Sequence, residues 1–473
     1  MRGHAGTSGT FGDTSGVCLP VPNPMLIPMD WRSLLQPRRI GRSAETTGQR
    51  DLDELRTEFF RDWDRIVFCS AFRRLQDKTQ VHPMAKTDYV RTRLTHSLEV
   101  ASVGRSLGMQ AGRVVSALDP GLRHLASPQD MGAIVAAACL MHDIGNPPFG
   151  HAGESAIQEY FRGPGRAWLQ DLPPAEQADL LHFEGNAQGF RTAVRLQHPE
   201  QPGGLQLTWP TLGAFAKYPC DAVSGLQPGA AVSCRKFGFM QGEGPLFAEV
   251  AEGLGLQRTG ASAWRRHPLA FLVEAADDIC YGVIDIEDGA KSGHITPEEL
   301  RALHTPFIDA VHRARADTLQ DRQHQAEYLR AVTIGVLVDR VARVFRERHD
   351  DILAGRFDQP LLDHIEGAQD FRRFKDPAAQ RLYDERSKLE LQVAGFEIIG
   401  WLLQALCDAV ESVAAGTSAS ERARMLVGLI PAGVQAAARL DRYQRLLTVT
   451  DFVAGMTDTY AVETYRRLRG FSA

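Results

Sequence analysis

The sequence predicts an all-α protein with low strand content, and three observations support this class. From about residue 50 onward, apolar side chains recur at the spacing of amphipathic helices. The most apolar segment, which ends at Met141, is too long for an ordinary strand. Stretches rich in Gly and Pro separate the periodic segments, as connections between helices do.

The first strongly periodic segment reads RLTHSLEVASVGRSLG. In it, His96, Val100, Val103 and Leu107 follow one another at the spacing of a single helix face. The spacing predicts a helix whose buried stripe brings a histidine into the interior.

The next segment, MGAIVAAACLMHDIG, is apolar on nearly all sides. This pattern predicts a central buried helix that ends near Gly145, because Pro147 and Pro148 cannot continue it. A new helix is expected in GHAGESAIQEYF, with His151 and Glu154 one turn apart in or near its first turn.

A later segment, RHPLAFLVEAADDICYGVIDIEDG, predicts a helix with one polar face. Successive spacings of three, four and four residues place on that face Glu274, Asp277, Tyr281 and Asp285. Residues 163–180 and 200–245 are irregular, with a short hairpin expected around VSCRKFGFM. Between residue 295 and the end, amphipathic helices are expected over residues 330–349, 389–413 and 448–471. Residues 1–28 are predicted to form a disordered tail, or to be an over-extended start with Met25 or Met29 as the true beginning.

Composition limits the class of protein. A net charge of -5 over 473 residues argues against a binder of bulk polyanions, which needs a broad basic surface. Seven scattered cysteines without a CxxC pair favour a reducing cytoplasm over a disulfide framework. The apolar stretch 133–141 is much shorter than the roughly 20 residues of a membrane-spanning helix, so no membrane segment or membrane partner is expected.

Histidines and carboxylates in these helices suggest a metal site. The adjacent pair His142 and Asp143 could simply cap a helix end, but His96 faces inward upstream and Asp277 lies on the polar face downstream. Two imidazoles and two carboxylates form a mixed shell suited to Mn, Fe, Ni, Co or Mg rather than to a structural zinc, which usually recruits thiolates.

Five motifs occur in order along residues 60–290: RTRLTHSLEV, MHDIGNPPFGHAGE, HFEGNAQGFR, TLGAFAKYP and EAADDICYGVID. This set resembles the HD-domain superfamily, and specifically the bacterial dGTP triphosphohydrolase (dNTPase) family. The closing segment DFVAGMTDTYAVETYRRL also resembles the end of that family. The resemblance implies an HD-domain catalytic core over residues 50–295 and a C-terminal helical region, residues 296–473, packed on it.

The resemblance assigns four ligands of a divalent metal ion (Mn2+, Mg2+, Co2+, Ni2+ or Fe2+): His96, His142, Asp143 and Asp277. Asp277 is preferred to Asp278 because the family places its last ligand four residues before a substrate-contacting tyrosine, here Tyr281. The implied reaction converts a dNTP, with dGTP favoured, to a deoxynucleoside and inorganic triphosphate. His151 is assigned as general acid or base and Glu154 as its orienting partner, although the residues without the resemblance favour an N-terminal capping pair.

The resemblance also implies substrate contacts. Arg93, Lys217 and Tyr218 are expected to contact phosphates. Tyr281 and Asp285 are expected to face the sugar, where the ring would exclude a 2'-hydroxyl and the carboxylate would accept from the 3'-hydroxyl. Gln80 is a weaker candidate for the sugar or base pocket, and Asn186 is expected to line the site without an assigned role.

Two alternatives remain open at this point. One is an HD phosphodiesterase that acts on another nucleotide phosphoester, and the other is a non-catalytic sensor of dNTPs or single-stranded DNA on an HD scaffold. The resemblance further implies a homo-oligomer, often a hexamer, and for some members an allosteric dNTP or single-stranded DNA. Nothing in the periodicity tests these partners.

Overall fold

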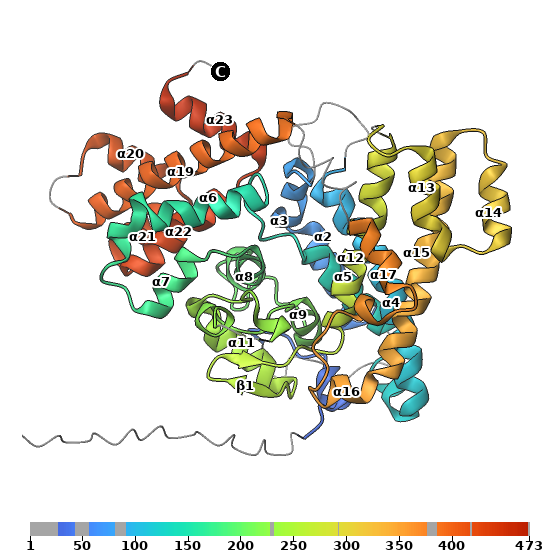
Figure 1. Cartoon of the computed structure of the whole chain (residues 1–473). Helices are drawn as coiled ribbons and strands as arrows, with labels where there is room; N and C mark the ends of the chain where they lie inside the picture. Colours follow the sequence, from blue (N-terminus) through green and yellow to red (C-terminus); the bar gives the residue numbers. More distant parts are fainter. Residues whose placement is uncertain are drawn as a thin grey trace, which may run out of the picture.

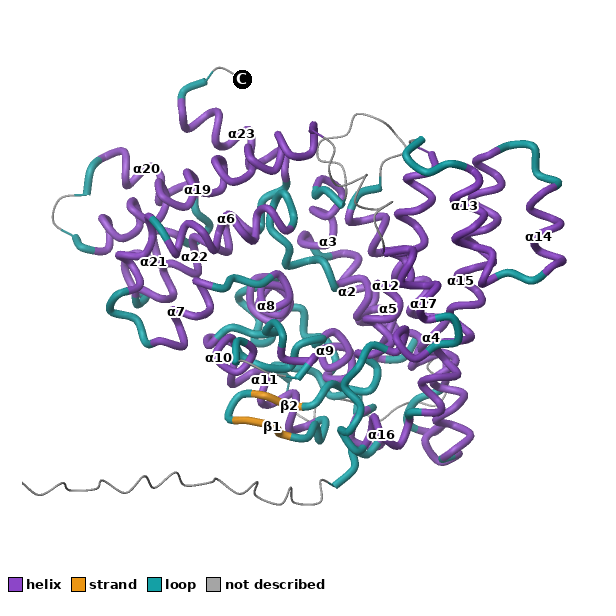
Figure 2. Tube along the Cα trace, in the orientation of Figure 1, coloured by secondary structure: helices purple, strands orange, loops and turns teal. Residues whose placement is uncertain are grey.

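The computed structural model describes residues 27–42, 56–80, 91–227, 231–291, 293–375, 386–416 and 419–471. Within these ranges the regular structure is helical apart from two short strands, so the predicted all-α class is confirmed (Figures 1 and 2). The predicted disordered tail, residues 1–28, lies outside the described residues except for its last two positions.

The elements follow in chain order, with short 3-10 or π turns between some of them. The first third forms α1 (Trp31–Leu34), α2 (Glu58–Phe68), α3 (Ser70–Arg74), α4 (Arg93–Leu118), α5 (Pro128–Met141), α6 (His151–Arg162), α7 (Pro174–Leu181) and α8 (Gly185–Arg191). The middle forms α9 (Trp209–Phe215), α10 (Ala222–Gly225), α11 (Gly244–Gly253), β1 (Arg258–Gly260), β2 (Ala263–Trp264) and α12 (Ala270–Lys291). The rest forms α13 (Pro297–His304), α14 (Ala310–Asp317), α15 (Arg322–Glu347), α16 (His349–Leu353), α17 (Ala368–Arg372), α19 (Arg386–Ala414), α20 (Glu421–Leu429), α21 (Gly433–Arg439), α22 (Arg442–Ala454) and α23 (Asp458–Arg469).

Helix α5 is the central helix that its apolar sequence predicts. A capping box between Ser127 and Asp130 starts it, Pro128 occupies its first position, and every residue from Asp130 to Met141 is buried. It packs against α2, α4, α9 and α12. A helix surrounded in this way can deliver the residues at its end to the interior of the protein.

Two hydrophobic clusters organise the described residues. The first cluster gathers around α4, α5, α9, α12 and α15. The second cluster gathers α6 and α7 with the C-terminal helices α19–α23. Figure 1 shows α6 and α7 beside α19–α23 on one side of the molecule and α13–α15 on the other. The range predicted as a C-terminal region, residues 296–473, therefore contributes to both clusters.

The hairpin expected around VSCRKFGFM is wrong. This segment contains a 3-10 turn, η6 (Val232–Cys234), and a loop whose Gly238 N–H donates to Cys220 O. A Cβ at Gly238 would lie 2.2 Å from Tyr218 O, so the segment packs flat against another loop instead of pairing with itself. The strand pair, β1 and β2, lies further along the chain (Figure 2).

Helix α19 is the one described helix that is long and apolar enough to cross a membrane, over Leu389–Ala414. Half of its most apolar window is buried within the protein. The helix contacts α6, α20 and α22, and its Ile399, Leu402 and Leu403 belong to the second cluster. These contacts are those of a core helix in a folded domain.

Candidate metal and acid–base site

Three helices bring together the histidines and the aspartate predicted as ligands. A capping box between Thr92 and Thr95 fixes the start of α4, so that His96 lies in its first turn, buried to 3% exposure. His142 is the residue at which α5 ends. Asp277 lies in the first half of α12, which packs against both α4 and α5.

The ligand atoms of His96, His142 and Asp277 lie within 4.8 Å of one another. Asp277 Oδ1 is 3.2 Å from His96 Nε2 and 3.6 Å from His142 Nε2. The two imidazole rings are 5.3 Å apart and steeply inclined. Such a cluster of two imidazoles and a carboxylate could hold a divalent metal ion.

A second contact fixes the orientation of the His142 ring. Its Nδ1 lies 2.6 Å from the carbonyl oxygen of Cys139, one turn earlier. Because a carbonyl only accepts, Nδ1 donates, and Nε2 faces Asp277 and His96. Histidine ligands of metals are commonly oriented by such a hydrogen bond from their other nitrogen.

The charges of the cluster stabilise its carboxylate. Burial alone would raise the pKa of Asp277, but His142, the hydrogen bond from His96, and Lys217 together lower this pKa far below its usual range. For His96, burial would lower the pKa of the ring, yet Asp277 and Asp143 raise it. The site therefore presents an ionised carboxylate to a cation.

Asp143, the fourth predicted ligand, lies beside the cluster but faces a cation of the protein. Its Oδ2 is 3.5 Å from His142 Nε2 and accepts a hydrogen bond from Arg93 Nη1 at 2.8 Å. Its Oδ1 accepts from Asn146 Nδ2 at 2.5 Å. Burial would raise the pKa of Asp143, but Arg93, His142 and His96 lower it. The three-residue cluster thus forms without Asp143, which Arg93 holds at its edge.

Arg93 connects this edge to the predicted acid–base pair. A Cβ on Gly150 would lie 2.6 Å from Arg93 Nη2, so only glycine allows this approach. Gly150 has φ +58° and directly precedes His151. The arginine predicted to contact phosphates therefore lies between Asp143 and the start of α6.

His151 and Glu154 form the predicted pair in the first turn of α6. His151 Nδ1 lies 3.1 Å from Glu154 Oε2, and Glu154 Oε1 accepts from Gly185 N–H at 2.7 Å. The imidazole is 85% exposed, whereas the carboxylate is 9% exposed. Burial would raise the pKa of Glu154, but the hydrogen bond from His151 and the charge of Lys236 lower it. An anchored carboxylate thus holds an accessible imidazole.

The predicted phosphate contacts lie near the metal cluster. Lys217 Nζ is 3.4 Å from Glu274 Oε1. Burial would lower the pKa of Lys217, but Glu274, Tyr218 and Asp277 raise it above its usual range. Lys217 therefore stays charged beside the polar face of α12.

Sequence reasoning missed a second lysine at this site. Lys236 Nζ is 2.9 Å from Glu184 Oε2, and its charge acts on Glu154. Asn186 Nδ2 donates to Glu184 Oε1 at 2.7 Å, which places the predicted Asn186 in the same group. Lys236 falls in the segment expected to form a hairpin, where no periodicity marks its direction. The place of Lys236 at the site becomes known only from the structure, in which its loop packs against Tyr218.

The residues predicted to face the sugar or base occupy α12 and the segment that follows the 3-10 turn η2 (Leu75–Asp77). Tyr281 is partly exposed and Asp285 is buried, one turn apart on α12. Gln80 Oε1 is buried and has no hydrogen-bond partner among the described residues. Such an orphaned acceptor is costly unless a ligand or water satisfies it.

Comparison with known proteins identifies the family of this chain. Residues 93–172 match the family model of the HD domain, and residues 366–467 match that of the phosphohydrolase-associated domain. The chain is 40% identical over 455 residues to a deoxyguanosinetriphosphate triphosphohydrolase-like protein of Pseudomonas aeruginosa (strain LESB58), which covers 94% of this chain and 100% of that protein. The chain belongs to the deoxyguanosinetriphosphate triphosphohydrolase-like family of HD-domain proteins.

Other members of this family match over the same extent. A protein of the same name from Synechocystis sp. (strain ATCC 27184 / PCC 6803 / Kazusa) is 40% identical over 462 residues, which are 94% of this chain and all of that protein. The deoxyguanosinetriphosphate triphosphohydrolase of Enterobacter sp. (strain 638) is 32% identical over 518 residues, covering 94% and 99% of the two chains. Membership of the family supports a metal-dependent hydrolase, in agreement with the His/Asp cluster.

Proposed function

We propose that the chain is a metal-dependent dNTP triphosphohydrolase, which releases a deoxynucleoside and intact inorganic triphosphate. The observation that carries this proposal is the loop from His142 to His151, which joins a metal-binding cluster to an acid–base pair. Relatives named for dGTP hydrolysis favour dGTP as the substrate.

The metal would be held by His96, His142 and Asp277. Asp143, whose Oδ2 also accepts a hydrogen bond from Arg93, would be the fourth ligand. The donor set fits Mn2+, Mg2+, Co2+, Ni2+ or Fe2+, because no thiolate belongs to the cluster. When bound, such an ion supplies Lewis acidity at the α-phosphoryl oxygen and lowers the pKa of a bound water.

His151 and Glu154 would supply the proton transfer. With Nδ1 donating to Glu154, the Nε2 of His151 faces solvent. In the imidazolium form, in which both ring nitrogens carry protons, Nε2 would give its proton to the 5'-oxygen as the bond between that oxygen and the α-phosphorus breaks, and in the neutral form it would act as a base. Glu154 in turn is held by the Gly185 N–H, so the imidazole keeps one tautomer and one direction.

The cations around the cluster would offset the charge of the triphosphate. Arg93, Lys217 and Lys236 approach from three separate segments, and Tyr218 lies beside the two lysines. Tyr281 and Asp285 would contact the deoxyribose, with the ring excluding a 2'-hydroxyl. Gln80, whose amide oxygen has no partner among the described residues, would donate to or accept from the sugar or base.

The decisive experiment incubates the full chain with each dNTP and each rNTP in the presence of Mn2+ and resolves the products by ion-exchange chromatography. The expected products are deoxynucleoside and inorganic triphosphate, from dNTPs alone. Release of a nucleoside monophosphate or of single phosphates would instead indicate another phosphoester hydrolase. Binding of a dNTP without any product would indicate a sensor.

The proposal extends to the state of the protein in the cell. Cytoplasmic dNTPs are its substrates, and a homo-oligomer, with a hexamer as the expected size, is its proposed assembly. Light scattering with and without dNTPs or single-stranded DNA tests the assembly and the effect of these ligands. A monomer under all conditions would remove the oligomer from the proposal without affecting the reaction.

A further inference from the structure

The backbone just before His151 has an unusual conformation. Phe149 has φ +63° and Gly150 has φ +58°, so two consecutive residues have a positive φ. Glycine adopts a positive φ freely, but a phenylalanine does so only where its surroundings hold it there. The direction of the first turn of α6, and with it the position of His151, depends on this pair.

A carboxylate from the far end of the chain holds Phe149. Asp458 Oδ1 accepts the Phe149 N–H at 2.9 Å, although 309 residues separate them. Asp458 Oδ2 accepts from the backbone N–H of Thr79 at 3.1 Å and also from its hydroxyl. Asp458 is 2% exposed, and it is the first residue of α23, where the helix dipole favours a negative charge.

Two further contacts tie the same loop to the C-terminal helices. Lys78 Nζ, buried, donates to the carbonyl oxygens of Asn146 at 2.5 Å and of Ala454 at 2.9 Å. The ring of Phe149 lies against Gly395 of α19, where a Cβ would come within 3.0 Å of it. The loop is thus held at Asn146 through Lys78 and at Phe149 through Asp458.

We propose that Asp458 is a positioning residue for the acid–base step, which acts by fixing Phe149 and thereby the imidazole of His151. This inference rests on the proposed function, because it concerns a residue of that same site. Asp458 does not belong to the metal cluster, and its contacts, Phe149 and Thr79, are not metal ligands. Its loss should therefore affect proton transfer and leave metal binding intact.

The test compares Asp458→Ala, Asp458→Asn and the unaltered full chain in dGTP hydrolysis with Mn2+. We expect kcat of Asp458→Ala to fall by at least about tenfold with KM changed by less than about twofold, because a displacement near 1 Å of a catalytic group can cost about a hundredfold. Asp458→Asn keeps one acceptor oxygen for the Phe149 N–H, so it should recover part of kcat. Titration with Mn2+ should give the same stoichiometry for all three proteins.

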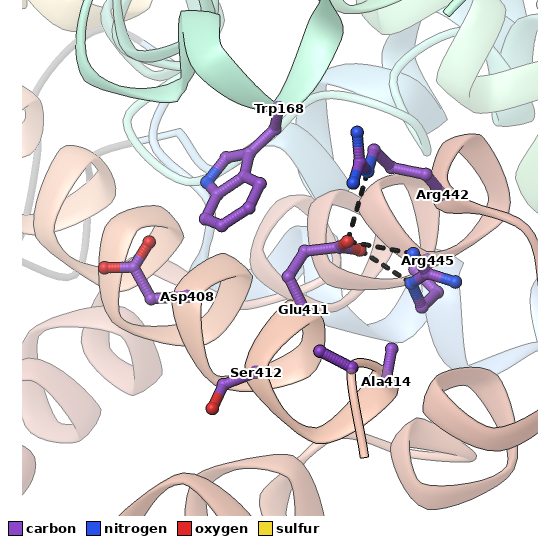
Figure 3. A pocket seen from close by; sticks show the side chains of 8 residues that line it. Trp168, Asp408, Glu411, Ser412, Ala414, Arg442 and Arg445 are labelled. Carbon is purple, nitrogen blue, oxygen red and sulfur yellow. Dashed lines mark hydrogen bonds and ion pairs between the residues drawn. The ribbon is translucent and has the colours of Figure 1, made fainter. Parts of the chain in front are cut away.

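Glu411→Ala is the matched control for a general loss of stability. Glu411 is also a buried carboxylate on a C-terminal helix, where Arg442 and Arg445 bind it beside Trp168 (Figure 3). None of its recorded partners belongs to the loop from His142 to His151. Glu411→Ala should lower the melting temperature as Asp458→Ala does, but leave kcat within about twofold. An equal loss of kcat in both variants would overturn the inference.

The double variant Asp458→Ala with His151→Ala distinguishes a route through the imidazole from an independent effect. If Asp458 acts through His151, the double variant has the kcat of His151→Ala, since the imidazole that Asp458 positions is already gone. If the fold-losses of kcat in the two single variants multiply in the double variant, Asp458 acts independently of His151, and this route is refuted. Absence of triphosphate release by the unaltered chain would defeat the proposed function itself, whereas normal release by Asp458→Ala would defeat only this inference.

Discussion

Gly185 offers a sharp test of the acid–base geometry through the substitution Gly185→Ala. A Cβ at this position would lie 2.3 Å from Asn146 Oδ1 and 2.7 Å from Glu154 Oε1. Since such contacts are normally well above 3 Å, these oxygens must move by about 1 Å. Both are ends of side chains, so the main chain need not move, and the cost in stability should be near the low end of overpacking, about 1 kcal/mol.

The effect on catalysis should be much larger than the effect on stability. The displaced oxygens belong to the carboxylate that holds His151 and to the amide that donates to Asp143. A shift of this size in a catalytic group can lower the rate about a hundredfold. Initial rates of triphosphate release at saturating dGTP would measure kcat, and thermal unfolding would measure stability on the same preparations.

Gly335→Ala is the control for adding a methyl group. Gly335 lies in the middle of α15 with no atom within 4 Å of an added Cβ, so alanine should stabilise the helix by about 0.5–1 kcal/mol and leave kcat unchanged. If Gly185→Ala retained full kcat, neither Glu154 nor Asn146 would need its observed position. The assignment of Glu154 as the orienting partner would then fail.

Three further predictions concern the metal, the sugar and pH. His142→Ala, or chelation of the metal, should abolish turnover together with Mn2+ binding, whereas His151→Ala should keep the metal and lose about 10²–10⁴ in kcat; paired metal titrations and rate measurements distinguish them. Tyr281→Ala should allow hydrolysis of rGTP. If the variant prefers dGTP as strongly as the unaltered chain does, the Tyr281 ring does not exclude the 2'-hydroxyl. Burial raises the pKa of Asp179 to about 8, even though Tyr443 donates to it, so the folded state retains a proton that the unfolded state loses near pH 4. The free energy of unfolding should therefore fall as the pH rises from about 4 to about 8, and Asp179→Asn should flatten that slope in denaturant titrations at several pH values.

Local sequence patterns predicted much of this structure because the spacing of apolar residues along a helix indicates which of its faces is buried. The stripe through His96 and the all-apolar run before His142 each place a residue on a helix, and packing of α4, α5 and α12 then makes these residues neighbours. The spacing on α12 also favoured Asp277, which the structure places with both histidines. The roles of these residues stay predictions until activity is measured.

The contacts that periodicity did not predict come from irregular segments or from distant parts of the chain. Lys236 lies in a loop that follows the shape of another loop, so no spacing rule gives its direction. Asp458 reads as an ordinary acidic residue at a helix start, and its partner Phe149 is 309 residues away. Such pairs are decided by how the two hydrophobic clusters meet, which is a property of the whole fold.

The meeting of these clusters has a consequence for how the protein responds to heat. Met141 and Ile144, beside the metal ligands, belong to the first cluster, whereas Phe149, Ala152 and Ala156, around the acid–base pair, belong to the second. The reacting groups are therefore divided between two bodies of packed side chains with separate cores. Warming that loosens the contact between them should end turnover while each body is still folded, so activity should disappear at a lower temperature than metal binding.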